Sequence, residues 1–112
     1  MKKIIVEETD IAETPHKVDV RKLFSFEHAT VVHITLKPGE KLRTHVTPVD
    51  ALFFGLCGEG IVMVGDEEAT LRENELVFSP KKIKHTLRNE SVKEFSFLVI
   101  KVPSQTEKTQ LL

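Results

Sequence analysis

Two histidines, His45 and His85, stand at positions that could carry chemistry. His45 follows Gly39 by six positions, and His85 follows Pro80 by five and precedes Asn89 by four. Each lies beside a segment rich in β-branched or apolar residues and is introduced by a Gly or Pro turn. An imidazole nitrogen can bind a metal ion, accept a proton or hydrogen-bond a ligand. If both segments are strands of one small barrel, the two side chains can meet in its interior.

The remaining pattern predicts an all-β chain with little helix. Short apolar runs recur about every eight to twelve residues between turn residues, and no long stretch keeps a 3.6-residue period. Gly58 to Gly60 predicts a hairpin turn, and Gly65 to Glu68 predicts a second turn. The expected strands are 4–6, 18–20, 23–26, 30–37, 51–57, 61–64, 70–71, 76–78, 86–88 and 95–102.

Both histidine segments resemble the signature motifs of the cupin superfamily, G-x5-H-x-H-x3,4-E-x6-G and G-x5-P-x-G-x2-H-x3-N. The resemblance covers residues 29–102 and implies a double-stranded β-helix, or jelly-roll barrel, within a single domain over 1–112. Residues 1–28 are expected to form amino-terminal edge strands, and 103–112 a frayed tail. Asn74 is expected to be left-handed in a turn, Pro80 to end a strand, and Lys82 replaces the glycine of the second motif.

The resemblance also implies where a metal would bind. In cupins the two histidines and the glutamate of the first motif, with the histidine of the second, bind Mn, Fe, Ni, Zn or Cu. The matching positions here are His45, Thr47, Ala51 and His85, so only two of the four side chains are the ligands expected. This predicts a divalent-metal site (Zn, Ni, Mn or Fe) that is weak or absent, and no organic cofactor.

Asp50 gives an alternative metal site. It stands one residue before the missing glutamate, where strict strand alternation turns its carboxylate away from the cavity. A break in the register at the preceding proline would turn it inward instead. His45, His85 and Asp50 would then form a set of three ligands with open positions for substrate, as in a metal-dependent dioxygenase or isomerase.

The expected ligand-binding residues in the cavity are His45, Thr47, His85 and Phe53. The alternative is that the two histidines have no role in binding and only hydrogen-bond each other, water or Thr47. The apolar wall is expected to come from Val32, Ala51, Phe53 and Phe78. Alternation places His33 outside the barrel, and Cys57 is expected in the core. His16 and His28 receive no function.

Composition and charge narrow the partners. The 112 residues carry a net charge of −1 and no apolar run long enough to span a bilayer, so neither nucleic acid nor a membrane is expected. The single cysteine excludes an intramolecular disulfide, and a cytoplasmic location is expected. Lys81, Lys82 and Lys84 form the one basic cluster. Either it is a solvated turn, or with Arg43 it attracts an anion to the cavity mouth.

Three functions stay open from these residues. The first is a protein that binds a small molecule, with an anion as one candidate, in a cavity whose metal site has decayed. The second is the metal-dependent enzyme that uses His45, His85 and Asp50, and the third is a purely structural or partner-binding domain. A homodimer is also expected, because edge strands and surplus apolar surface favour pairing with a second copy.

Overall fold

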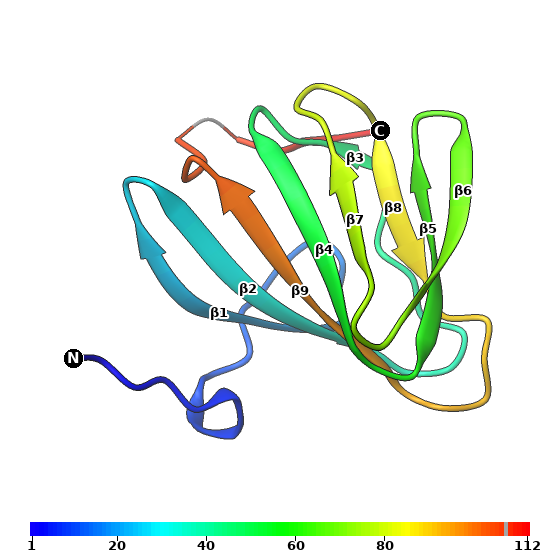
Figure 1. Ribbon diagram of the computed structural model, residues 1–112, viewed down its shortest axis with the longest axis horizontal. Coiled ribbons are helices and arrows are strands. Elements are labelled where there is room, and N and C mark those ends of the chain that lie inside the picture. The colour runs from blue at the N-terminus through cyan, green and yellow to red at the C-terminus, as the bar shows by residue number, and fades with distance from the viewer. Residues whose placement is uncertain (107) are drawn as a thin grey trace.

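The computed structural model describes residues 1–106 and 108–112, which form an almost entirely β structure (Figure 1). One 3-10 turn, η1, spans Val6–Glu8. The strands are β1 (Asp19–Phe26), β2 (Ala29–Leu36), β3 (His45–Val46), β4 (Asp50–Cys57), β5 (Glu59–Val64), β6 (Glu67–Arg72), β7 (Leu76–Ser79), β8 (His85–Arg88), β9 (Phe95–Val102) and β10 (Gln110–Leu111). In the described residues, no helix has the length and apolar character needed to cross a bilayer.

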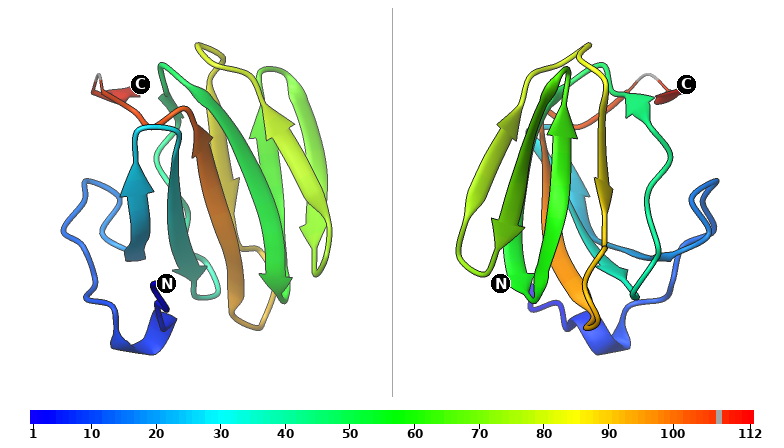
Figure 2. Two further views of the ribbon diagram at one scale, coloured as in Figure 1. Left: turned by 60° about the vertical axis from the view of Figure 1, so that its left-hand side comes forward. Right: turned by 90° about the vertical axis from the view of Figure 1, so that its right-hand side faces the viewer.

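The strands form two antiparallel sheets that face each other (Figure 2). Their orders are β1-β2-β9-β4-β7 and β10-β3-β8-β5-β6. Strands that follow one another in sequence, such as β4 and β5, often lie in different sheets, so the chain winds back and forth between the sheets. This is the double-stranded β-helix, and the predicted fold class is confirmed.

The hairpin predicted at Gly58 is wrong. β4 pairs with β7 and β9, whereas β5 pairs with β6 and β8, so this turn carries the chain from one sheet to the other. Gly58 has φ +72°, and a Cβ there would lie 2.1 Å from the carbonyl oxygen of Glu94. Glycine is therefore required by a tight crossing. The turn predicted at Gly65 is confirmed, since Val64 pairs directly with Glu67 across it.

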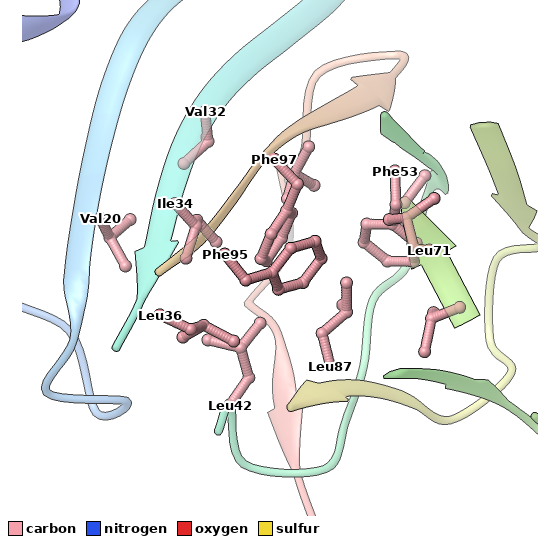
Figure 3. Close-up of a cluster of buried hydrophobic side chains, with 13 residues drawn as sticks. Val20, Val32, Ile34, Leu36, Leu42, Phe53, Leu71, Leu87, Phe95 and Phe97 are labelled. Atoms are coloured by element: carbon pink, nitrogen blue, oxygen red, sulfur yellow. The ribbon is translucent and has the colours of Figure 1, made fainter. Parts of the chain in front are cut away.

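The hydrophobic core is a cluster of buried side chains (Figure 3). Along β9, Phe95 and Phe97 face inward and are completely buried, and Val99 follows them on the same face. Their partners on β2 are Leu36, Ile34 and Val32, in that order. The next inward pair is Thr30 with Lys101. The interior thus changes from large apolar side chains to smaller and polar ones, which leaves room at the polar end.

Two side chains expected inside lie outside. On β7, Ser79 pairs with Ala51 and is completely buried, so its neighbour Phe78 faces outward and is 55% exposed. Phe78 is therefore not part of the cavity wall. Cys57 is also exposed, because it ends β4 after a bulge that shifts the register between Gly55 and Cys57. Local sequence does not reveal either register.

Both chain ends differ from the expectation. No strand forms at 4–6, where the chain enters the turn η1, and the two short strands expected at 18–20 and 23–26 are one strand, β1. The tail expected to fray carries β10, in which Leu111 pairs with His45. The backbone N–H of Leu112 also donates to the carbonyl oxygen of Thr44. Residues 110–112 are thus held by long-range backbone pairing with residues 44–46.

The predicted turn chemistry in 73–82 is confirmed, and it leads to a stability prediction. Asn74 is left-handed at φ +65°, and β7 ends immediately before Pro80. Lys82 also has φ +63°, at the position where the second motif has glycine. Because a left-handed non-glycine residue is strained, Lys82→Gly should raise the free energy of unfolding by about 0.5–1 kcal/mol in urea denaturation. Lys81→Gly, at a position with an ordinary φ, should lower the free energy of unfolding. Equal effects of the two substitutions would show that backbone strain at Lys82 is not the cause.

Candidate functional site

A cavity of about 330 Å³ lies at the polar end of the barrel. Its wall is mostly apolar and includes Val32, Ala51 and Phe53 at inward positions of β2 and β4, as predicted. The expected residues His45, Thr47 and His85 line it too. Both histidine segments therefore contribute to one hollow inside the barrel.

His45 and His85 meet inside this cavity and hydrogen-bond each other. They pair directly between β3 and β8, and their Nε2 atoms are 3.0 Å apart. The Nδ1 of His45 lies 2.6 Å from the carbonyl oxygen of Arg43, which can only accept, so this nitrogen carries a proton. In the neutral ring Nε2 is then the acceptor, and the Nε2–H of His85 donates to it. His85 Nδ1 in turn accepts from the hydroxyl of Ser79 at 2.8 Å.

This chain of hydrogen bonds fixes the tautomers of both rings. It runs from the Ser79 hydroxyl through His85 and His45 to the Arg43 carbonyl. Ser79 is completely buried on β7 and does not line the cavity. The Ser79 hydroxyl orients the His85 ring. The sequence motif does not include this serine, so it did not predict the contact.

Burial keeps the cavity imidazoles neutral near pH 7. Desolvation lowers the pKa of His85 to about 3, with further lowering by the charges of His45 and Lys101. Desolvation also lowers the pKa of His45, which the hydrogen bond to the Arg43 carbonyl opposes. The Phe53 ring packs nearly perpendicular to that of His85, with centroids 5.2 Å apart, and adds to the apolar surroundings.

His16 is a third imidazole in the cavity wall, which sequence reasoning missed. Its ring centroid lies 5.0 Å from that of His45, and its Nδ1 accepts the backbone N–H of Arg43 at 3.0 Å. Desolvation and the charge of His45 lower its pKa to about 4. Its flanking residues, Pro15 and Lys17, give no signal of this role, because only the folded amino-terminal segment brings the ring to the barrel.

The cationic side chains at the cavity are Lys22 and Lys101, not the basic cluster. Lys81, Lys82 and Lys84 are exposed and do not line it. Lys101 is half-buried at the last inward position of β9. Alternation alone could have revealed it, since Lys101 shares a face with the buried Phe97 and Val99. The Arg43 side chain does not line the cavity either, so the alternative of an anion-attracting mouth built from these residues gains no support, although the Arg43 backbone hydrogen-bonds His16 and His45.

Asp50 does not join the histidines. It starts β4 with its side chain on the face opposite the buried Ala51, and its carboxylate accepts the backbone N–H of Lys81 at 2.8 Å. The register does not break at the proline, so strict alternation holds. Asp50 is absent from the cavity wall, and the three-ligand set with His45 and His85 does not form.

The remaining donors do not fit the divalent metal of the resembling family. Within the described ranges no group of three His, Cys, Asp or Glu side chains is arranged to hold a metal ion. The Nε2 atoms of His45 and His85, which would bind the metal ion, are hydrogen-bonded to each other instead. Thr47 donates its hydroxyl to the carbonyl oxygen of Val49 at 3.0 Å, and Ala51 has no ligand atom. A catalytic zinc site uses three protein ligands, so this arrangement is one ligand short and lacks an anionic one.

A second hollow of about 1170 Å³ lies on the outer face, beneath the amino-terminal segment. His33 lines it, which agrees with the prediction that this side chain lies outside the barrel. The Nδ1 of His33 is buried there without a hydrogen-bond partner among the described residues. This groove contains neither motif histidine, so the candidate site is the smaller cavity.

Comparison with known proteins agrees with the geometry. The family model for the cupin domain matches residues 32–101. The chain belongs to the cupin family. This cupin is 30% identical to a Thermus thermophilus protein of known structure, which superposes with a TM-score of 0.79 and covers 92% of this chain and 98% of that one.

Two further proteins, one a relative by sequence and one similar in fold alone, also match. An uncharacterised Methanocaldococcus jannaschii protein is 28% identical over 85 residues, 75% of this cupin and 73% of its own length. Its crystal structure, of an RmlC-like cupin, superposes with a TM-score of 0.72 at 24% identity over 85% and 88% of the two chains. The polyketide cyclase RemF of Streptomyces resistomycificus reaches a TM-score of 0.84 at 16% identity, over 100% and 85%. At such identity the likeness concerns the fold alone.

Proposed function

We propose that this cupin binds a small organic molecule in its barrel cavity without a resident divalent metal. The observation that carries the proposal is the bond between His45 and His85, whose ring nitrogens are all engaged with protein partners. They form a rigid polar rim on a mostly apolar hollow. Such a hollow, with few polar groups in fixed positions, is typical of small-molecule sites.

The size of the cavity supports a compact ligand. A volume of about 330 Å³ is at the low end of the range for ligand pockets, about 300–1,000 Å³. It is nevertheless too large to be a packing defect, which argues against a purely structural domain. The metal-dependent dioxygenase or isomerase loses its support, because Asp50 faces away from the histidines.

A neutral probe tests the proposal. Titration of 3-phenylpropionamide, followed by ¹H–¹⁵N NMR, should shift the resonances of cavity residues in the wild type. Ala51→Leu fills the cavity from an inward position and should weaken this binding at least about tenfold. Ala69→Leu, the same change at an exposed position of β6, is the matched control and should bind normally. Binding that survives Ala51→Leu would place the site elsewhere.

We also infer a homodimer in solution, from exposed apolar side chains on two edge strands. Phe24 and Phe26 on β1 and Leu76 and Phe78 on β7 are all exposed, and both strands are edges of the same sheet. Pairing with a second copy would cover them. Light scattering should give about twice the 12.7 kDa of one chain. A mass of one chain at micromolar concentration would refute this inference.

A further inference from the structure

We propose that Lys101, with Lys22 and His16 beside it, forms a carboxylate-binding subsite in the cavity. The proposal rests on the function proposed above and names the class of its ligand, a monocarboxylate with a compact apolar body. Lys101 ends the inward-facing row of β9, and its side chain lines the cavity. Its Nζ donates to the side-chain oxygen of Gln105 at 2.9 Å, a neutral acceptor.

The titratable side chains around Lys101 in the cavity wall are another lysine and three histidines, and none of them can carry a negative charge near pH 7. Lys22 comes from β1, His16 from the amino-terminal segment, His45 from β3 and His85 from β8, and all of them line the same cavity. No described residue of the cavity wall is Asp or Glu. The positive charge of Lys101 is close enough to contribute to the lowered pKa of all three histidines, and desolvation and Lys22 lower the pKa of Lys101 itself.

Three arginines elsewhere in the described chain have carboxylate partners. Arg21 pairs with Asp19 at 2.9 Å, and Arg72 pairs with Glu59 at 3.2 Å. Arg88 pairs with two glutamates. Lys101, which is more desolvated than an ordinary surface lysine, has instead an amide as its described polar partner. A partly buried cation without an anionic partner costs stability, and an anionic ligand would remove that cost.

The donors and the wall together favour a monocarboxylate. Because His16 Nδ1 accepts a backbone N–H, its neutral ring carries the proton on Nε2 and is a donor. An ammonium group and an imidazole N–H provide two donors for two carboxylate oxygens. The wall beyond them is apolar, with Val32, Phe53 and Val99. This matches a short acid whose body is a branched aliphatic group or a single aromatic ring.

The decisive experiment compares 3-phenylpropionate with 3-phenylpropionamide, which share a shape and differ in charge. In titration calorimetry at pH 7.5 the acid should bind wild-type protein at least about tenfold more tightly than the amide. Lys101→Met should abolish this preference by weakening the acid and should leave amide affinity within about twofold. It should also raise Tm by about 3 °C, because it removes a desolvated cation. Lys81→Met, at an exposed position, should change neither affinity.

The outcomes separate the two proposals. Equal affinity of acid and amide for the wild type, or a preference for the acid that persists in Lys101→Met, would overturn the subsite and leave the proposed function intact. Failure of both probes to shift any cavity resonance would overturn the proposed function. Glu107 lies outside the described residues, so Glu107→Gln is included as a variant. A tenfold gain in acid affinity on this change would mean that the chain supplies its own anion, and the subsite would be rejected.

Discussion

Replacement of Thr47 by His together with Ala51 by Glu is expected to raise the affinity for Zn²⁺ or Ni²⁺ by about three orders of magnitude. Both positions line the cavity beside His45 and His85, so the double variant would provide three imidazoles and a carboxylate. The carboxylate matters most, because it neutralises part of the dication where water is largely excluded. Isothermal titration of metal-free protein measures the change.

The structure adds a condition that the motif does not contain. Ala51 pairs directly with Lys101 across β4 and β9, so a glutamate at this position would meet a cation as well as the metal. Adding Lys101→Met to the double variant should therefore raise the affinity about another tenfold. Thr70→His with Ala69→Glu places the same residue types on the exposed strand β6 and is the matched control. Sub-micromolar binding by the wild type that disappears in Asp50→Ala would contradict the site described here.

The second large effect is a loss of stability in mild acid. The pKa of His85 is about 3 in the folded protein and about 6.5 in the unfolded chain, so the unfolded state binds a proton first as the pH falls. The contribution of the neutral His85 ring to the free energy of unfolding is fully present above pH 6.5. It is lost progressively as the pH falls from 6.5 to 3. From pH 7.5 to 5, His85 alone should account for about 2 kcal/mol of the fall in unfolding free energy.

Urea denaturation at the two pH values tests this prediction. His85→Gln removes the titrating group, so its unfolding free energy should fall about 2 kcal/mol less than that of the wild type over the same interval. His28→Gln changes an exposed histidine and should follow the wild type. His45 and His16 also have a lowered pKa, so they too reduce the free energy of unfolding as the pH falls. Both residues are present in the two variants, so their contribution does not distinguish them. An identical fall in the wild type and His85→Gln would show that burial of His85 is not the cause.

Much of the fold followed from local physics. The alternation of apolar and polar residues predicted an all-β chain, and the motif spacing placed His45 and His85 together. Asn74, Pro80 and Gly65 behave as expected, because a left-handed angle, a missing donor and a tight turn are properties of one or two residues. Strict alternation also placed Asp50 correctly, on the face away from the cavity.

The strand pattern, the barrel class and the pair of interior histidines could thus be predicted from the residues alone, whereas the rest of the site depends on how distant strands pack. Gly58 changes sheets rather than closing a hairpin, and Phe78 faces outward, because each register depends on which distant strand lies beside it. His16 reaches the histidine pair only through a long-range contact, and Ser79, six residues before His85, meets it because β7 and β8 lie in facing sheets. The charge of the cavity comes from Lys22 and Lys101, which meet there only when β1 and β9 pack into one sheet. A short stretch of sequence cannot predict this, because the contacts that hold these strands together involve residues far apart in the chain.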